Sequence, residues 1–449
     1  MNILARTLKG FRDFLPEKQI PREQLIDKIK KTYQTFGFSP LETPVLEYAD
    51  VLTGKYGDEG DKLMYKFRDN GDREVAMRYD LTIPLARVVA EYPELKKPFK
   101  RYQISPVWRA ENTQKGRFRE FYQCDADIIG SDSPLADAEI LALSAQTMYD
   151  LGVRNFVVRV NSREIISAFY GGRLKLTLEK QLPIIRIVDK IDKIGADGIK
   201  KELITLGLKD SDADAVIVFS KTVIDSVDDL SKITELFPET KESLNKLYYI
   251  IAKAQELVPD ANFKVDFSIA RGLDYYTGMI FETNLNDLAL FGSVLSGGRY
   301  DKLVGMFGKN DVSAVGASVG LDRLFSALEE LKLVDTNKQT VAEVFVLNLG
   351  EELLPEYNLI LRELRMAHIK TVFYFSSIDM KKQLAYASTL KIPFAVIFGE
   401  NEKKEGIILV KDLNVETNSK TILDTKHLGK QEKIKMGELT SYILKMLDR

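Results

Sequence analysis

Cysteine and histidine are scarce in this chain. Among its 449 residues there is one cysteine, Cys124, and there are two histidines, His368 and His427. A single cysteine cannot form a disulfide within the chain, which fits a reducing compartment. Zinc sites built from cysteine and histidine are excluded because the ligands are too few. Any chemistry before residue 340 must also work without Ser-His-Asp or Cys-His mechanisms, because both histidines lie after that point.

Long apolar runs and an excess of one charge are also missing. The first residues, MNILARTLKGFRDFLPEK, hold no apolar run like that of a signal peptide. No stretch approaches the roughly 18 apolar residues that a membrane span requires. Lys plus Arg number 64 and Asp plus Glu number 66, so the chain has little net charge, although a local basic patch could still bind nucleic acid. We therefore expect a cytoplasmic protein without membrane contact.

The length and the apolar pattern predict several domains. Residues 1–331 predict an α+β body with a mostly antiparallel sheet, and a lysine-rich helical insertion interrupts it at about 165–258. The polar, unpatterned residues 332–341 predict a linker. Residues 342–449 alternate between strand and helix patterns, which indicates a small α/β domain.

Within the body, the spacing of apolar residues predicts individual elements. We expect a helix at 22–36, an extended segment at 38–48, and a strand at 75–82 leading into a helix at 83–92 with Thr82 as N-cap. Further strands are expected at 263–283, 290–296 and 312–320, followed by a helix over 320–331.

Residues 99–130 predict a β-hairpin, in which FKRYQISPVWRA and FREFYQCDADIIG are joined by the polar loop ENTQKGR. Side chains alternate between the two faces of such a ribbon. One face is apolar and carries Tyr102, Trp108 and Cys124. The opposite face carries Gln103, Ser105, Arg109, Glu111, Arg119, Gln123, Asp125 and Asp127. That polar face is either an outer surface in contact with water or the wall of a ligand site.

The common nucleotide-binding loops are absent. The chain contains neither G-x-x-x-x-G-K-[ST] nor a G-x-G-x-x-G on a strand-to-helix turn. A phosphate site would therefore depend on arginine, whose planar and permanently charged guanidinium binds pairs of phosphate oxygens. Arg109, Arg271 and Arg323 are the candidates, although a lone arginine is usually a surface residue or an ion-pair partner. The glycines expected to admit a ligand are Gly272, Gly297, Gly298 and Gly320.

The stretch RGLDYYTGMIFE, residues 271–282, places Arg271, Asp274, Tyr275 and Tyr276 beside two glycines at the start of a predicted strand segment. One interpretation is a turn with a pair of core aromatic residues. The other is a pocket that binds a planar group and an anionic group.

The chain resembles the class II aminoacyl-tRNA synthetases. GFSPLETPVLE, ISPVWRAE with FREFYQCDADIIG, and GASVGLDRL are similar to the three motifs of that class. KGFRDFLPE, RYDLTIPLARVVA, QKGRFREFYQCD, RGLDYYTGMIFE and GGRYDKLVGMFG resemble signatures of the histidyl-tRNA synthetase family. The similarity extends over essentially the whole chain, the insertion matching only loosely, and the C-terminal part resembles that family's anticodon-binding domain. The resemblance implies a mixed, mostly antiparallel class II sheet and a homodimer that joins histidine to its tRNA with ATP.

The resemblance also implies how ATP would be handled. Arg271 and Arg109 would be catalytic, with Arg271 stabilising charge on the α-phosphate as the histidine carboxylate attacks it. No general base is needed, because the attacking group is already ionised. ATP would enter with Mg²⁺, and no metal would be held by cysteine or histidine. The implied ATP-binding residues are Arg109, Glu111, Arg117 and Arg323.

Two further sets of residues follow from the resemblance. The implied histidine-binding residues are Asp80, Leu81, Thr82, Arg109, Gln123, Asp127, Arg271, Tyr275, Tyr276 and Tyr300. The implied tRNA contacts are Gln114 and Lys115 near the acceptor end, and Lys381 and Lys382 in the C-terminal domain. Those two lysines also fit a simple exposed helix face.

Three other functions are compatible with parts of the sequence. A regulatory paralogue that partners ATP phosphoribosyltransferase in histidine biosynthesis would resemble the body, but it would lack the C-terminal domain and have eroded signatures. A class II synthetase for threonine or proline is disfavoured by RGLDYYTG and by the lack of zinc ligands. A plain RNA-binding protein would not need Arg109, Arg271 and Arg323 together.

Overall fold

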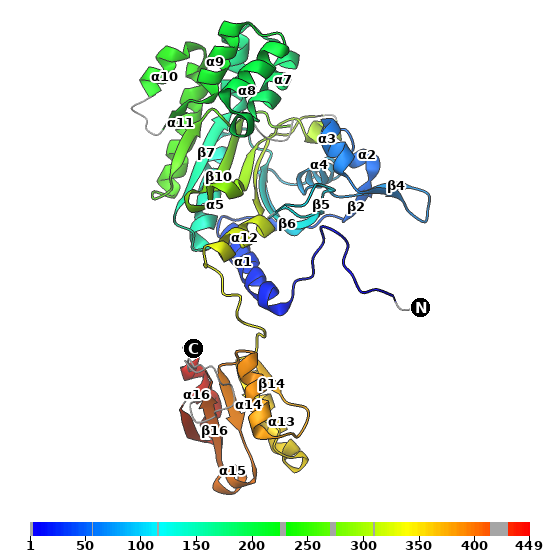
Figure 1. Cartoon of the computed structure of the whole chain (residues 1–449), viewed down its shortest axis with the longest axis vertical. Coiled ribbons are helices and arrows are strands. Elements are labelled where there is room, and N and C mark those ends of the chain that lie inside the picture. Colours follow the sequence, from blue (N-terminus) through cyan, green and yellow to red (C-terminus); the bar gives the residue numbers. More distant parts are fainter. Residues whose placement is uncertain are drawn as a thin grey trace. The chain divides into compact units, whose positions relative to one another are not determined.

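A computed structural model of the chain (Figure 1) describes residues 3–55, 57–114, 116–224, 230–269, 275–308, 310–413 and 430–449, with the side chains at 57–59, 192, 193, 230 and 290 left out. The chain divides into two compact units. One comprises Met1–Asp13 and Gln24–Leu333, and the other comprises Phe14–Glu23 and Val334–Arg449. Across the described residues, no helix is both long enough and apolar enough to cross a bilayer.

A large mixed sheet forms the centre of the first unit (Figure 1). Among the described residues, nine strands join it in the order β1-β5-β6-β12-β11-β10-β7-β9-β8. The strands are β1 (Ser39–Pro40), β5 (Phe99–Trp108), β6 (Glu120–Ile129), β7 (Phe156–Ser162), β8 (Val223–Ile224), β9 (Phe263–Asp266), β10 (Met279–Leu285), β11 (Ser293–Arg299) and β12 (Ala314–Gly320). Pairs from β5 through to β7 are antiparallel, whereas β1–β5 and β7–β9 are parallel. The predicted mixed, mostly antiparallel sheet is confirmed.

The predicted hairpin is formed by β5 and β6. Arg101 pairs with Asp127, Gln103 with Asp125 and Ser105 with Gln123, so the polar side chains share one face as the alternation predicts. Arg101, Gln103, Ser105, Asp125 and Asp127 are all buried. This part of the polar face is therefore not in contact with water, and the inner half of the hairpin is a polar layer within the unit.

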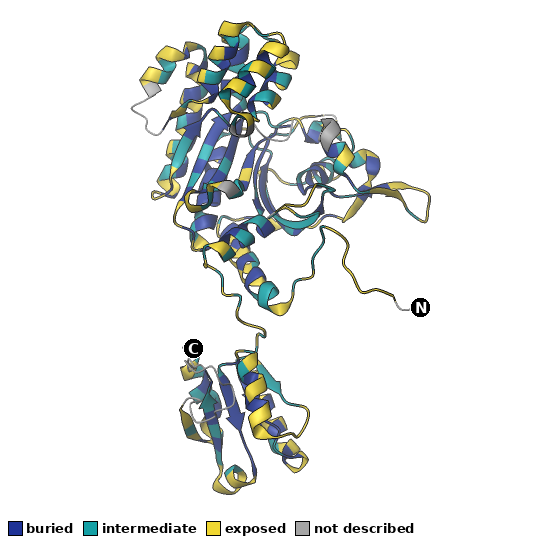
Figure 2. Ribbon diagram, in the orientation of Figure 1, coloured by how far each residue is buried: buried dark blue, intermediate teal, exposed yellow. Residues whose placement is uncertain are grey.

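Two helices cover the sheet. Helix α5 (Pro134–Asp150) begins at Ser133, whose Oγ accepts a hydrogen bond from the backbone N–H of Leu135 at 3.3 Å. Its apolar side chains are buried on several sides, because it lies between the sheet and α11 (Lys241–Leu257). Figure 2 shows buried residues along α5, β7 and β10. Helix α12 (Leu321–Glu330) follows β12 directly and buries Leu321, Leu324, Phe325 and Leu328 as its spacing predicts.

The N-terminal elements bring a second, smaller sheet. Strands β2 (Leu46–Tyr48), β4 (Glu74–Met77) and β3 (Lys66–Arg68) form it in that order. The helices of this part are α1 (Pro16–Thr35), α2 (Ala49–Leu52), α3 (Gly57–Leu63) and α4 (Thr82–Glu91). The strand predicted at 75–82 ends at Met77. Thr82 is not the N-cap of α4; the carboxylate of Asp80 accepts the N–H groups of Thr82 at 3.2 Å and Ile83 at 3.1 Å instead.

The segment predicted as a helical insertion is helical in the structure. It contains α6 (Arg163–Ala168), α7 (Leu178–Val188), α8 (Ile191–Thr205), α9 (Asp210–Ser220), α10 (Leu230–Leu236) and α11. Its core is aromatic: Phe169 stacks on Phe219 with ring centroids 4.0 Å apart, and Phe237 meets both rings edge-on. The two-residue strand β8 follows α9 and pairs with β9 at the edge of the main sheet. A strand this short is not predictable from its sequence.

The strand prediction over 263–283 is confirmed at its two ends, by β9 and the start of β10, but not for Tyr275 and Tyr276 between them. Strands β9 and β10 lie on opposite sides of β7, so the chain must cross over between Asp266 and Met279. Tyr275 and Tyr276 precede β10 and are not part of a strand. Period-two alternation cannot reveal a crossover, because it reports which face a residue occupies and not which strand is its neighbour.

The second unit is a small α/β domain, as predicted. Among its described residues, five strands form a sheet in the order β14-β13-β15-β16-β17. The strands are β13 (Val344–Val346), β14 (Thr371–Phe373), β15 (Phe394–Ile397), β16 (Ile407–Asp412) and β17 (Gln431–Lys435). The helices are α13 (Leu354–Met366), α14 (Met380–Thr389), α15 (Glu400–Glu405) and α16 (Leu439–Met446). Two apolar clusters form its core, one of which joins Tyr357, Val396 and Ile443.

Candidate active site

A cavity of about 330 Å³ opens in the first unit between the β5–β6 hairpin, the start of α4, the segment before β10, strand β11 and the junction of β12 with α12. We call it the pocket. It is lined by Asp80, Thr82, Arg109, Glu111, Gly116, Arg117, Phe118, Phe121, Gln123, Tyr275, Tyr276, Ser293, Val294, Leu295, Ser296, Ser318, Gly320, Asp322 and Arg323. Many of the residues named from the sequence thus come together in one cavity, although they come from distant parts of the chain.

Arg109 lies just past the end of β5 and is held on several sides. Its Nε donates to the Tyr79 carbonyl at 3.0 Å, and its Nη2 donates to the Gln123 side-chain oxygen at 3.4 Å. Its guanidinium carbon lies 4.4 Å from the centre of the Tyr79 ring and 5.1 Å from that of Phe121. These contacts orient the guanidinium on the pocket wall before any ligand binds.

Arg323 and Arg117 bring two more positive charges to the pocket. Arg323, in the first turn of α12, donates from Nη1 to the Ser293 carbonyl at 2.8 Å. Burial lowers the pKa of Arg323, and the nearby Arg117 and Arg109 cations lower it further. Arg117 lies 3.8 Å from the Glu111 carboxylate in a loose ion pair. Gathered cations of this kind favour a polyanionic ligand.

The start of α4 supplies the carboxylate of Asp80 and the side chain of Thr82. Asp80 is buried, and its capping bonds fix its position at the pocket wall. Leu81 lies between them, but its side chain is fully buried and does not line the pocket. The Leu81 carbonyl instead accepts a hydrogen bond from Arg101 Nη2 at 3.0 Å.

Three tyrosines pack edge-to-face beside this carboxylate. The ring centroid of Tyr275 lies 5.1 Å from that of Tyr276 and 5.7 Å from that of Tyr300. Burial raises the pKa of all three phenols, so they are neutral hydrogen-bonding groups. Tyr275 and Tyr276 line the pocket, whereas Tyr300 lies behind it and donates its hydroxyl to Asp127.

Arg101 is the functional residue that the sequence reasoning missed. It is fully buried, and its Nη2 lies 2.9 Å from Asp127 Oδ2. One cation is therefore shared by the Asp127 carboxylate and the Leu81 carbonyl. The alternation of the hairpin places Arg101 on the polar face with Gln103 and Asp127, and this was the available signal.

Asp125 lies beside this ion pair. Burial raises the pKa of Asp125 to about 7, Arg101 opposes that rise, and the Asp127 charge adds to it. Burial also raises the pKa of Asp127. Two carboxylates therefore compete for one buried cation, and this region of the site favours an additional positive charge.

Other residues named from the sequence lie elsewhere. Arg271 and Lys115 fall outside the described residues, as does Gly272. Gln114 and Arg117 exchange backbone hydrogen bonds at 3.1 and 2.9 Å, which closes the tip of the hairpin loop. Lys381 and Lys382 are exposed in the first turn of α14, in the second unit.

The glycines of β11 do not admit a ligand. A Cβ on Gly297 would lie 2.1 Å from the Gly316 carbonyl, and one on Gly298 would lie 2.9 Å from the Tyr276 ring. These positions are glycine because protein atoms already fill the space beside them. Gly320 is different, because a Cβ there would meet nothing closer than the Val294 carbonyl at 3.9 Å, and this residue lines the pocket.

Comparison with protein families identifies both units. A family model described as Histidyl-tRNA synthetase matches residues 10–324, and one described as Anticodon binding domain matches residues 343–446. The first model alone spans more than half of the chain.

Individual relatives agree with these models. The histidine–tRNA ligase of Clostridium tetani (strain Massachusetts / E88) is 41% identical over 423 residues, which are 92% of this chain and 94% of that protein. The histidine–tRNA ligase of Rhodopirellula baltica (strain DSM 10527 / NCIMB 13988 / SH1) is 42% identical over 420 residues, with the same coverage. The crystal structure of histidyl-tRNA synthetase from Nostoc sp. PCC 7120 superposes with a TM-score of 0.86 at 32% identity, covering 99% of this chain and 100% of that one.

Proposed function

The chain belongs to the histidyl-tRNA synthetase family, and from this we propose how its pocket works as a histidine–tRNA ligase. The enzyme activates L-histidine with ATP to histidyl-adenylate and pyrophosphate, and it then transfers histidine to the 3′ end of its tRNA. In the first step the histidine carboxylate attacks the α-phosphate of ATP, a P–O bond forms, and pyrophosphate leaves.

The observation that carries the proposal is the separation of charge along the pocket. At one end, near the Asp127–Gly316 pair of β6 and β12, the buried carboxylates of Asp80, Asp125 and Asp127 lie close together. At the other end, toward the Gln123–Gly320 pair, lie Arg109, Arg117 and Arg323, whose three positive charges exceed the negative charges of Glu111 and Asp322 among them. Four residues of strand separate these points by roughly 13 Å. A cationic, hydrogen-bonding amino acid fits the first end and a polyphosphate fits the second.

The arginine end is the proposed ATP site. Arg109, Arg117 and Arg323 would contact phosphate oxygens, and Phe118 and Phe121 offer planar apolar surfaces to a purine. Catalysis then depends on charge stabilisation and proximity, with Arg109 and Arg271 as the catalytic cations.

Mg²⁺ is proposed to enter with ATP. Glu111 is a carboxylate at the arginine end, 3.8 Å from Arg117, and among the described residues no three Asp, Glu, His or Cys side chains converge as a metal cage. This donor set suits Mg²⁺, which is commonly held by one or two carboxylates together with substrate phosphates. The ion would neutralise charge on the leaving pyrophosphate.

The carboxylate end is the proposed histidine site. Asp80 on the pocket wall, and Asp127 buried behind it between Arg101 and Tyr300, would receive the ammonium group and a ring N–H. Tyr276 and Gln123 would complete the hydrogen bonds. Thr82 and Tyr275 would shape the wall, Tyr300 would support it from behind, and Arg271 would meet the substrate carboxylate. Apolar amino acids of similar size would leave these buried groups without partners, which is a strong basis for rejection.

The tRNA is proposed to meet both units. Gln114 pairs with Arg117, which lines the pocket, and Lys115 follows Gln114 in the sequence, so an acceptor end bound at this loop would be near the pocket. In the second unit, Lys381 and Lys382 are exposed at the start of α14, and Phe375 just before it is 90% exposed. Lysines suit phosphate contacts and an exposed ring suits base stacking.

A cytoplasmic homodimer is the proposed working form. The small sheet of the first unit and Val45 just before it expose four apolar side chains, with exposed fractions between 41% and 56%: Val45, Leu46, Tyr48 and Phe67. Apolar side chains gathered on one surface element are typical of a protein–protein interface. A second copy of the chain is the proposed partner for this surface.

Histidine-dependent exchange of pyrophosphate into ATP tests the proposed function. We expect exchange with L-histidine and none above background with threonine, proline or phenylalanine. Folded protein that shows no exchange with histidine would refute the proposal and favour the regulatory alternative. The match of residues 343–446 to the anticodon-binding model already favours the ligase, because an anticodon-binding domain serves tRNA recognition.

A further inference from the structure

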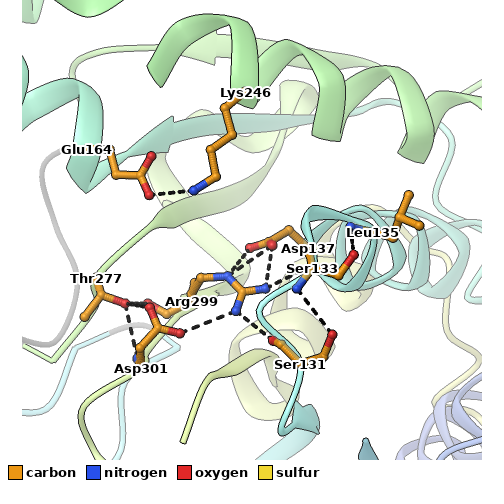
Figure 3. Close-up of polar contacts among 9 residues, drawn as sticks. All are labelled: Ser131, Ser133, Leu135, Asp137, Glu164, Lys246, Thr277, Arg299 and Asp301. Carbon is orange, nitrogen blue, oxygen red and sulfur yellow. Dashed lines mark hydrogen bonds and ion pairs between the residues drawn. The ribbon is translucent and has the colours of Figure 1, made fainter. Parts of the chain in front are cut away.

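Arg299 is buried at the end of β11, outside the pocket, and every nitrogen of its guanidinium donates a hydrogen bond (Figure 3). Its Nε lies 3.0 and 3.1 Å from the two Asp137 oxygens, and its Nη2 lies 2.6 Å from Asp137 Oδ2. Nη1 reaches the Ser131 carbonyl at 2.9 Å, and Nη2 also reaches the Ser133 carbonyl at 3.3 Å. The side chains of Arg299 and Asp137 are 7% and 2% exposed. A guanidinium can satisfy this many acceptors in fixed directions, whereas a lysine cannot.

The same residue holds the segment that precedes β10. The Arg299 carbonyl accepts the N–H of Thr277 at 2.8 Å. The Thr277 hydroxyl bonds the Asp301 carboxylate at 2.5 Å and accepts the Asp301 N–H at 3.2 Å. Asp301 Oδ1 in turn lies 3.4 Å from Arg299 Nη1. Arg299, Asp301 and Thr277 therefore form a closed ring of contacts, which Figure 3 shows beside the Asp137 pair.

Two members of this ring, Thr277 and Arg299, are sequence neighbours of tyrosines of the site. Tyr276 directly precedes Thr277, and its ring packs where a Cβ on Gly298 would lie. Tyr300 directly follows Arg299, and its hydroxyl donates to Asp127. A Cβ on Gly278 would lie 3.0 Å from Arg299 Cδ, so the segment also rests on the stem of this arginine. A shift of Arg299 would therefore displace Tyr300, its sequence neighbour, and Tyr276, the neighbour of its hydrogen-bond partner Thr277.

We infer that Arg299, braced by Asp137, is a positioning residue that sets Tyr276 and Tyr300 for the recognition of histidine. The inference rests on the proposed function of the pocket. Stability alone is a weak reason for such a pair, because a buried ion pair often gives no more stability than apolar residues of similar volume. Fixed orientation is what the fully bonded guanidinium adds.

The other substrate is expected to be insensitive to Arg299. Arg323 at the ATP end is tied to Ser293, the first residue of β11, whereas Arg299 is its last. Six residues of strand place these two points roughly 20 Å apart. Loss of the ring around Arg299 should therefore weaken histidine binding and leave ATP binding nearly unchanged.

The test compares Thr277→Val and Arg299→Lys with Lys246→Met as the matched control. Lys246 lies in the same region and its charge acts on Asp137, but its hydrogen bond goes to Glu164 at 2.7 Å and not to the ring (Figure 3). It therefore controls for a change of charge near Asp137. Initial rates of pyrophosphate exchange give KM for histidine and for ATP separately. We expect KM for histidine to rise about fivefold in Thr277→Val and tenfold or more in Arg299→Lys, with KM for ATP within about twofold. Lys246→Met should match the wild type in both constants.

Each outcome decides the inference. A histidine-selective rise in Thr277→Val supports it, and this milder variant decides alone if Arg299→Lys does not fold. An unchanged KM for histidine, or equal rises for histidine and ATP, would overturn it and leave Arg299 a residue of the fold only. Wild-type protein without histidine-dependent exchange would instead refute the proposed function, so the two failures are distinguishable.

Discussion

Single buried charges decide how the site responds to pH. Asp125 and Asp127 share the Arg101 cation, and burial raises the pKa of Asp125 to about 7. A carboxyl whose pKa is higher in the folded state than in the unfolded chain takes up its proton more readily when folded. It therefore contributes stability at low pH that is lost as the pH rises toward 7. Well above pH 7 the Asp125 carboxylate is charged in the folded and the unfolded state alike, and no further stability is lost.

Asp125→Asn should remove this loss, because the amide remains neutral at every pH. We expect the variant to match the wild type near pH 4 and to exceed its free energy of unfolding at pH 8 by on the order of 1–3 kcal/mol. Urea unfolding followed by the fluorescence of Trp108 measures this in the first unit alone, because it is the chain's one tryptophan and lies in β5.

Asp127→Asn is the contrasting variant. It removes the carboxylate that lies 2.9 Å from Arg101 and leaves that buried cation only its attraction to Asp125. We expect it to be less stable than the wild type at pH 8. Equal behaviour of the two variants would contradict the different roles assigned to these neighbouring carboxylates.

Arg271 carries the proposed stabilisation of charge at the α-phosphate, although it lies outside the described residues. Arg271→Ala should lower the rate of adenylate formation by about 100-fold or more, with only a modest change in histidine affinity. Single-turnover formation of histidyl-adenylate, with histidine affinity measured by calorimetry, separates the two. Intact adenylate formation would show that the assigned role is wrong.

Residue types alone predicted part of the site. Arg109 and Gln123 were placed on one polar face by strand alternation, and they do meet on the pocket wall. Arg101 was missed, because strand alternation places a charged residue on the polar face but does not show whether its side chain contacts water or a buried carboxylate. The cap of α4 was assigned to Thr82 because hydroxyls are favoured there, whereas the carboxylate two residues earlier takes the role.

At the scale of elements, the packing of strand β12 against β6 requires a glycine at position 316. Gly316 pairs with Asp127, and a Cβ on Gly316 would lie 1.9 Å from the Asp127 carboxylate. Gly316→Ala should force Asp127 away from Tyr300, raising KM for histidine about tenfold and costing about 1–3 kcal/mol of stability. Exchange kinetics and urea unfolding of the same variant measure both effects.

Gly308→Ala serves as its control. A Cβ on Gly308 would meet only ordinary contacts at 3.8 Å, and its backbone is not in the left-handed region. This variant should retain the wild-type constants for both substrates. If Gly316→Ala raised KM for ATP as much as KM for histidine, the strand would not be acting through Asp127.

Elements were predictable where the pattern is local. The hairpin of β5 and β6 follows from alternation and a polar loop, and α12 follows from its apolar stripe. The order of β9 and β10 around β7 was not predictable, because it is decided by packing between residues far apart in the sequence. Tyr275 and Tyr276 were therefore assigned to a strand when they belong to the crossover that ends at β10.

For the whole molecule, the two units divide the proposed work between chemistry and tRNA binding. Lys381→Ala combined with Lys382→Ala should raise KM for tRNA about three- to tenfold in the charging reaction. Pyrophosphate exchange, which needs no tRNA, should be unchanged. The salt dependence of tRNA binding should also become less steep, because fewer phosphate contacts release counterions.

Lys403→Ala is the matched control in the same unit. Lys403 lies 2.7 Å from Glu356, so its charge is already paired. Its removal should leave tRNA charging close to that of the wild type. A loss as large as that of the double variant would mean that the general charge of the unit, and not the start of α14, attracts tRNA.

The broad organisation was readable from the change in pattern near residue 340, where alternating strand and helix signals begin. The boundaries of 331 and 342 remain predictions. The grouping of Phe14–Glu23 with the second unit was not foreseen, because membership of a unit depends on contacts in space and not on sequence order.

The solitary Cys124 has a practical consequence. It carries a reduced thiol on the buried face of β6, and its exposed fraction is zero. Its own carbonyl accepts the Tyr33 hydroxyl at 2.9 Å. Thiol-reactive dyes should therefore not reach it in the folded protein, and the natural chain needs no cysteine removal before labelling. One new cysteine on the surface of each unit would accept a donor and acceptor pair, and energy transfer between the dyes would test whether the distance between the units changes while tRNA is charged.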